Sequence, residues 1–110
     1  MKTVLLVSSE AAHRKLYQEE LAKRFKVEIS SDEPEETRKI DAIVYDIPTL
    51  HTIVDLKWLR SVDLPVVVLT CESAWRIPKS AKRRVLSYPV KIEQILAALA
   101  ELGIVGSQYA

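Results

Sequence analysis

The sequence predicts an α/β fold, in which helices cover both faces of a five-stranded parallel sheet. Three short apolar runs, rich in β-branched side chains, predict strands at residues 4–7, 42–45 and 66–69. The runs are continuous rather than alternating, which is typical of parallel strands buried on both faces. Helical patterns separate them along the chain. Strands that alternate with helices pair in parallel through right-handed crossovers, so we expect a doubly wound sheet.

Two weaker strand candidates complete the sheet. Residues 26–30 alternate between apolar and polar side chains, which predicts a strand at an edge of the sheet. Residues 84–87 form the fifth candidate, which we also expect towards an edge. Five strands with helical connections in this sequence fit the flavodoxin-like arrangement, whose strand order is 2-1-3-4-5.

Four segments have a helical pattern: residues 10–25, 33–39, 52–61 and 92–102. Ser9 is the expected N-cap of the first segment, and Pro34 lies in the first turn of the second. The last segment has the apolar spacing of a buried stripe, and Gly103 follows where helices commonly end. Pro78 interrupts residues 72–83, so any helix in that stretch is short or broken.

Length, charge and cysteine content limit the class of protein. The 110 residues suit one domain, which we place at 1–105, with a flexible tail at 106–110. A formal net charge of +1 predicts binding neither to nucleic acid nor to a membrane. Cys71 is the single cysteine, so no intramolecular disulfide forms. The first apolar run is too short for a signal peptide or a membrane span, so we expect a cytoplasmic protein.

Several polar residues follow the predicted strands directly. Ser8 and Ser9 come after the first strand, Asp46 after the third, Thr70 after the fourth and Tyr88 after the fifth. In an open parallel sheet the carboxyl ends of the strands meet at one edge, where ligands bind. We therefore expect these side chains to converge on one site.

Four pieces of the chain resemble the receiver domains of two-component response regulators, and together they cover nearly its whole length: residues 2–10, 41–46, 64–70 and 85–93. The resemblance implies that Asp46 corresponds to the aspartate that accepts a phosphoryl group. It also implies that Thr70 corresponds to the hydroxyl residue that contacts this group. The last piece resembles the strand and turn where receivers carry a Lys-Pro pair.

The departures from the receiver pattern fall on the phosphorylation site. Receivers hold Mg²⁺ with two adjacent acidic residues, and Ser8 and Ser9 occupy those positions here. Tyr88 replaces the lysine that pairs with the phosphoryl group. Val85 replaces the aromatic residue that receivers use as a packing switch. Mg²⁺ prefers carboxylate oxygens, and phosphoryl transfer depends on neutralising charge. The stretch at 70–88 is also shorter than usual, which implies a short or remodelled fourth helix.

These departures predict an atypical receiver, or pseudo-receiver, which signals by protein–protein contact without normal Mg²⁺-dependent aspartyl phosphorylation. The resemblance implies a protein partner, which is a histidine kinase, an output protein or another receiver; a homodimer stays open. We expect no cofactor and no enzymatic activity, because no nucleophile–base pair or carboxylate dyad can be assembled. We expect Mg²⁺ as a cofactor only if the domain can be phosphorylated.

Two alternatives remain. In the first, Asp46 still accepts phosphate by a weaker or metal-independent route. In the second, the chain is a flavodoxin-like domain that binds a nucleotide or another anion, for which only the turn at Ser8 and Ser9 offers support. Asp46 could equally be a structural residue that caps the turn after its strand.

A cluster of basic residues is the candidate interface, formed by Lys79, Lys82, Arg83 and Arg84, with Trp75 beside it. A solvated face is the ordinary explanation, contact with an acidic partner is the next, and nucleic acid is disfavoured because no stacking platform accompanies the charges.

Three further side chains have no assigned function. His13 and His51 lack partners at metal-ligand spacing, so we expect both on the surface. Cys71 is expected to be a small buried residue, because no Cys-His arrangement is visible.

Overall fold

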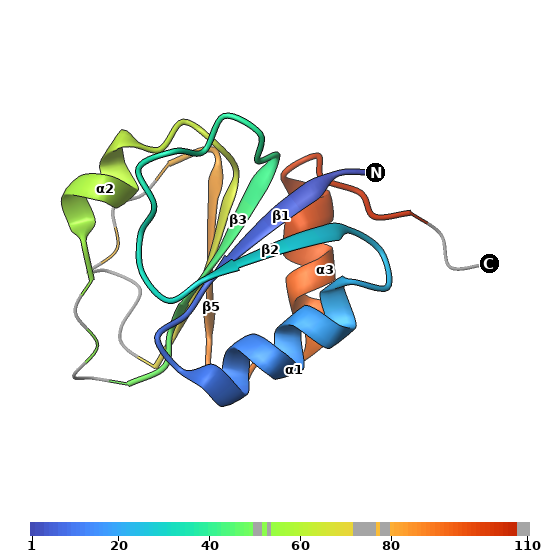
Figure 1. Cartoon of the computed structure of the whole chain (residues 1–110), viewed down its shortest axis with the longest axis horizontal. Coiled ribbons are helices and arrows are strands. Elements are labelled where there is room, and N and C mark those ends of the chain that lie inside the picture. Colours follow the sequence, from blue (N-terminus) through green and yellow to red (C-terminus); the bar gives the residue numbers. More distant parts are fainter. Residues whose placement is uncertain (50–51, 53, 72–76, 78–79, 108–110) are drawn as a thin grey trace.

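The computed structural model describes residues 1–49, 52, 54–71, 77 and 80–107. Five strands form one parallel sheet in the order β2-β1-β3-β4-β5, which confirms the predicted topology (Figure 1). The strands are β1 (Thr3–Val7), β2 (Lys26–Ser30), β3 (Ala42–Ile47), β4 (Val66–Thr70) and β5 (Arg83–Ser87). The helices in the described part of the chain are α1 (Ala11–Leu21), α2 (Leu56–Ser61) and α3 (Ile92–Glu101). Strands β2 and β5 lie at the two edges, as their sequences predict.

The helices cover both faces of the sheet, with α1 and α3 on one side and α2 on the other (Figure 1). Successive strand residues point to opposite faces, so β1 supplies Val4 and Leu6 to the core under α1 and α3. It supplies Leu5 and Val7 to the core on the α2 side. Every residue of β1, β3 and β4 is buried, which is why their sequences are continuous apolar runs.

Helix α3 follows its predicted pattern closely. Ile95 and Leu99 are fully buried one turn apart, so the apolar stripe of the sequence packs on the sheet. Gly103 adopts a φ of +86° just after the helix, a left-handed conformation that glycine takes without steric cost. The described start of the tail contacts the turn between α1 and β2, since the amide of Ser107 donates to the carbonyl of Arg24 at 2.9 Å.

The helix predicted at 33–39 is absent, and that prediction was wrong. The segment has no apolar stripe that could hold a helix on the sheet. It forms a loop instead, and two side chains, one from α2 and one from β3, donate hydrogen bonds to it. The indole Nε1 of Trp58 donates to the carbonyl of Pro34 at 2.8 Å, and the hydroxyl of Tyr45 donates to the carboxylate of Glu33.

Two helix starts also differ from prediction. Helix α1 has Glu10 rather than Ser9 as its N-cap, because the hydroxyl of Ser8 accepts from the amide of Glu10 at 3.1 Å and sets the turn one residue later. Helix α2 begins at Leu56 rather than at residue 52, where the Asp55 carboxylate accepts from the Trp58 amide at 2.9 Å.

The connection from β4 to β5 agrees with the predicted shortening of the fourth helix, since none of its described residues is helical. In the part of the chain that the structure describes, no helix has the length and apolar character needed to cross a bilayer.

Candidate functional site

Asp46 lies at the carboxyl end of the sheet with a fully buried side chain. It is the second-last residue of β3, a central strand, and pairs with Leu69 of β4. The carboxylate has 0% relative exposure. Burying a carboxylate is costly unless donors replace its water, so the protein must supply several hydrogen bonds here.

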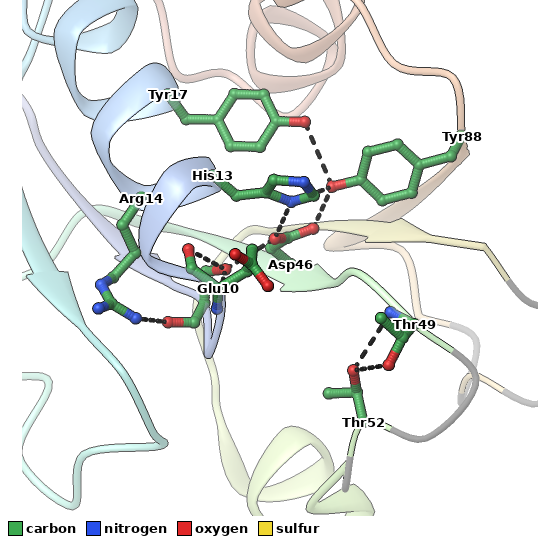
Figure 2. A network of polar contacts seen from close by, with 9 residues as sticks. Glu10, His13, Arg14, Tyr17, Asp46, Thr49, Thr52 and Tyr88 are labelled. Atoms are coloured by element: carbon green, nitrogen blue, oxygen red, sulfur yellow. Dashed lines mark hydrogen bonds and ion pairs between the residues drawn. The ribbon is translucent and has the colours of Figure 1, made fainter.

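Three side chains donate those hydrogen bonds and occupy both carboxylate oxygens (Figure 2). Oδ2 of Asp46 accepts from the hydroxyl of Ser8 at 2.7 Å and contacts Nδ1 of His13 at 2.8 Å. Oδ1 accepts from the phenol of Tyr88. Ser8 follows β1, His13 is in the first turn of α1, and Tyr88 follows β5. Four separate pieces of the chain therefore meet at one carboxylate.

A second tyrosine extends the network. The hydroxyl of Tyr17, one helical turn after His13, donates to the hydroxyl of Tyr88 at 3.2 Å. Burial, together with the hydrogen bonds to Asp46 and Tyr17, raises the pKa of Tyr88 far above its ordinary value. Burial likewise raises the pKa of Tyr17. Both phenols therefore keep their protons and serve as donors at neutral pH.

The donors of the network can be assigned from this chain of contacts. Tyr17 gives its proton to Tyr88, and Tyr88 and Ser8 give theirs to Asp46. An ionised carboxylate only accepts, so Nδ1 of His13 must carry a hydrogen to complete its contact. The imidazole is thus in the Nδ1–H form, with its second nitrogen, Nε2, uninvolved in this network.

Ser8 joins the network to the start of α1. Its hydroxyl oxygen accepts from the amide of Glu10 while its proton goes to Asp46. Its backbone carbonyl accepts from Nη1 of Arg14 at 2.6 Å, and its amide donates to the carbonyl of Ser30 on β2 at 3.0 Å. These contacts fix the turn that presents His13.

Comparison with known proteins identifies the fold. No protein-family model matches the sequence, and no curated protein is similar to it. Solved structures are similar over nearly the whole chain. A response regulator receiver protein from Sinorhizobium medicae superposes with a TM-score of 0.75 and 21% identity, covering 92% of this chain and 93% of its own. The chain has the receiver fold.

Two further structures with the receiver fold agree. The chemotaxis protein CheY4 of Vibrio cholerae matches with a TM-score of 0.74 and 20% identity, covering 93% of this chain and 98% of its own. The signal receiver domain of an HD domain-containing protein from Pseudomonas fluorescens matches with a TM-score of 0.69 and 18% identity. The match covers 93% of this chain and 87% of that domain's chain.

The receiver fold brings together three of the residues that sequence analysis singled out, namely Ser8, Asp46 and Tyr88. Ser9 is exposed, unlike Ser8. Thr70 is fully buried at the end of β4, and its carbonyl accepts from the amide of Tyr88 at 3.0 Å. The peptide bond between Tyr88 and Pro89 is cis. Thr70 therefore helps to place the turn from which Tyr88 reaches Asp46.

The residues present do not fit a receiver's magnesium site. Ser8 and Ser9 offer hydroxyls where receivers carry carboxylates, and Asp46 has both oxygens committed to side-chain donors. Among the described residues, no group of three histidine, cysteine, aspartate or glutamate side chains could hold a metal ion. A metal ion could reach Asp46 only after the network around it had opened.

Sequence analysis missed His13 and Tyr17. His13 is partly exposed, as expected, but it is also bonded to Asp46, a contact that its sequence position did not predict. The available clue was that His13 and Tyr17 lie four residues apart, on one face of α1, just after the first strand. That face of α1 points towards the end of β3. The direction in which it points is set by the packing of the helix on the sheet, and the local sequence pattern does not contain it.

A hollow of about 460 Å³ lies beside Asp46 at the carboxyl edge of the sheet. Most of its described lining residues carry hydroxyl or carboxyl groups: Ser8, Ser9, Ser31, Asp32, Glu33, Tyr45, Asp46, Thr49 and Thr52. None of the described lining residues is cationic. This chemistry is unfavourable for a phosphate or another anion.

The candidate interface divides between different neighbours. Arg83 and Arg84 are consecutive in β5, so their side chains lie on opposite sides of the sheet. Nη2 of Arg83 donates to the carbonyl of Leu59 in α2 at 2.8 Å. Nε of Arg84 donates to the carboxylate of Glu101 in α3 at 3.2 Å. Lys82 pairs with Asp63 at 2.8 Å. Trp75, Lys79 and His51 lie outside the described residues.

Cys71 is exposed, and its predicted burial was wrong. It follows Thr70, the last residue of β4, and so lies beyond the buried part of the sheet.

Proposed function

We propose that this protein is an atypical receiver domain of two-component signal transduction, which acts by protein–protein contact without Mg²⁺-dependent aspartyl phosphorylation. The receiver fold supports the general class. The observation that carries the finer proposal is the closed hydrogen-bond network around Asp46, which has no exposed carboxylate surface.

The network opposes both requirements of aspartyl phosphorylation. A carboxylate oxygen must reach the phosphorus atom, whereas Oδ1 and Oδ2 of Asp46 already accept hydrogen bonds from protein donors. The phosphoryl charge must also be neutralised by a metal ion and a cation. Tyr88, with its raised pKa, is a neutral donor in the position where receivers carry lysine.

The same network gives the domain a rigid edge for contact with a partner. Asp46 ties the ends of β1, β3 and β5 to α1, so the loops at this edge share one set of hydrogen bonds. The partner is a histidine kinase, an output protein or another receiver in the cytoplasm, and the domain itself is neither an enzyme nor a cofactor carrier.

Phosphorylation by acetyl phosphate with Mg²⁺ tests this proposal. An aspartyl phosphate is an acyl phosphate, which both alkali and hydroxylamine cleave, so alkali-labile phosphate on the intact protein measures it. We expect none on the native chain. The matched variant Ser8→Asp, Ser9→Asp, Tyr88→Lys restores the charges of a receiver, and its folding is checked by circular dichroism. Rapid formation of alkali-labile phosphate on native Asp46 would contradict the proposal and favour a phosphorylatable receiver.

A further inference from the structure

His13 and Asp46 form a dyad that the proposed function does not use. Nδ1 of His13 lies 2.8 Å from the buried carboxylate, while 31% of the His13 side chain is exposed. Within the described part of the chain, no hydrogen bond involves Nε2 of His13. In a neutral imidazole, a carboxylate at Nδ1 favours the tautomer that carries its hydrogen on Nδ1 and its lone pair on Nε2.

Two tyrosine rings hold the imidazole in this orientation. The ring centroid of His13 lies 5.8 Å from that of Tyr17, edge to face, and 5.7 Å from that of Tyr88 (Figure 2). Neither phenol competes for Nε2, because Tyr17 donates to Tyr88 and Tyr88 donates to Asp46. The nucleophilic nitrogen is therefore pre-oriented before any donor arrives.

We propose that Nε2 of His13 accepts a phosphoryl group from a small or protein-borne phosphoryl donor, either a phosphoramidate or an acyl phosphate. The Nε2 lone pair forms a bond to phosphorus as the bond from phosphorus to the donor's leaving group breaks. A leaving carboxylate departs with that electron pair, and so does a leaving amine whose nitrogen is already protonated in the donor, so that it leaves as the neutral amine. The product is a phosphoramidate on His13, whose Nδ1–H remains bonded to Asp46.

Asp46 acts in this step as a positioning residue. Attack by Nε2 places positive charge on the imidazole ring, and a buried carboxylate against Nδ1–H stabilises that charge more strongly than water does. Ser8 and Tyr88 hold the carboxylate in place from its other sides.

The site differs from the aspartate expected of a receiver in its accessibility. His13 is partly exposed, whereas the side chain of Asp46 has 0% relative exposure. The carboxylate thus changes from the acceptor of the phosphoryl group to the residue that orients its acceptor. This inference stands apart from the proposed function, since a His13 phosphoramidate needs neither Mg²⁺ nor an open Asp46.

Incubation with potassium phosphoramidate, followed by phosphorus NMR and peptide mapping, tests the inference. We expect one phosphohistidine per chain, stable to alkali but labile to acid, on the peptide that contains His13. The matched control is His51→Gln, because the chain has only two histidines. His51→Gln should retain the phosphoryl group, and His13→Gln should lose it.

The Asp46→Asn variant tests the dyad itself. It removes the negative charge but keeps a side chain of the same shape, so we expect uptake at His13 to slow by about tenfold or more. An unchanged rate would overturn the role of Asp46. Absence of phosphohistidine from the folded native chain, or phosphohistidine at His51 alone, would overturn the site and leave the proposed function intact. Alkali-labile phosphate on Asp46 would overturn both.

Discussion

The phenol of Tyr88 donates a hydrogen bond to the buried carboxylate of Asp46 and thereby joins the turn after β5 to the end of β3. The resemblance to receivers implies that a lysine, which pairs with a phosphoryl group, would stand at the position of Tyr88. In this chain a neutral phenol donates a hydrogen bond directly to the Asp46 carboxylate, so the contact between the two residues forms without a phosphoryl group. The predictions below follow from this contact and from the donors beside it.

Replacing Tyr88 by Phe should lower the free energy of unfolding by about 1–3 kcal/mol, because it removes a donor from a buried carboxylate. The Tyr17→Phe variant is the matched comparison, since its hydroxyl donates to a neutral oxygen, and it should cost about 1 kcal/mol. Urea denaturation measures both. An equal loss of unfolding free energy in the two variants would show that the hydrogen bond to Asp46 stabilises the fold no more than the one between the two tyrosines.

The two adjacent serines offer a second comparison. Ser8→Ala removes a buried donor from Asp46 and should lower the free energy of unfolding by about 1–3 kcal/mol. Ser9 is exposed, so Ser9→Ala should change it by less than about 0.5 kcal/mol. Thermal denaturation followed by circular dichroism distinguishes them. A larger loss for Ser9→Ala would argue against the hydrogen-bond network as described.

Three of the four tyrosines should ionise only at unusually high pH. The pKa values of Tyr17, Tyr45 and Tyr88 are raised, in each case mainly by burial. A raised pKa in the folded state gives stability that is fully present below the unfolded pKa of 10.0 and is lost as pH rises through the folded pKa. The free energy of unfolding should therefore fall above pH 10, and less steeply in Tyr88→Phe.

Ultraviolet absorbance of tyrosinate measures this titration. Tyr17, Tyr45 and Tyr88 of the native chain should form tyrosinate only at higher pH, as the protein unfolds. Ionisation of all four tyrosines together at the ordinary value, with the fold intact, would exclude the buried network.

The indole of Trp58 should hold the loop at 33–39. Trp58→Phe keeps an aromatic ring against Tyr45 but removes the hydrogen bond to the Pro34 carbonyl, which is worth about 1 kcal/mol. Hydrogen exchange should speed up in that loop and remain unchanged in α3. Lys57→Ala, an exposed neighbour in α2, is the control and should leave the loop unaffected.

Local sequence pattern predicted the sheet well because its strands are buried on both faces. The apolar runs that end at Tyr45 and Leu69 are too short for helices that could be buried in this way, and their ends place Asp46 and Thr70 at one edge of the sheet. The pattern failed for residues 33–39, where helix-start features outweighed the lack of an apolar stripe.

The composition of the candidate site was only partly predictable. Ser8, Asp46 and Tyr88 lie at the carboxyl ends of strands, so topology alone brings them together. His13 joins them because of the rotation of α1 on the sheet, which depends on packing around residues such as Leu21. No spacing rule for metal ligands or catalytic pairs contains that information.

Amide NMR spectra with Mg²⁺, before and after addition of beryllofluoride, test whether the carboxylate of Asp46 is closed to a phosphoryl group. Beryllofluoride mimics the phosphoryl group on a receiver's aspartate and needs an accessible carboxylate. We predict unchanged resonances for Asp46, Thr70 and Tyr88, because the carboxylate is already held by Ser8, His13 and Tyr88. Saturable shifts centred on Asp46 and Thr70 would contradict the account and show that the network opens to a phosphoryl group.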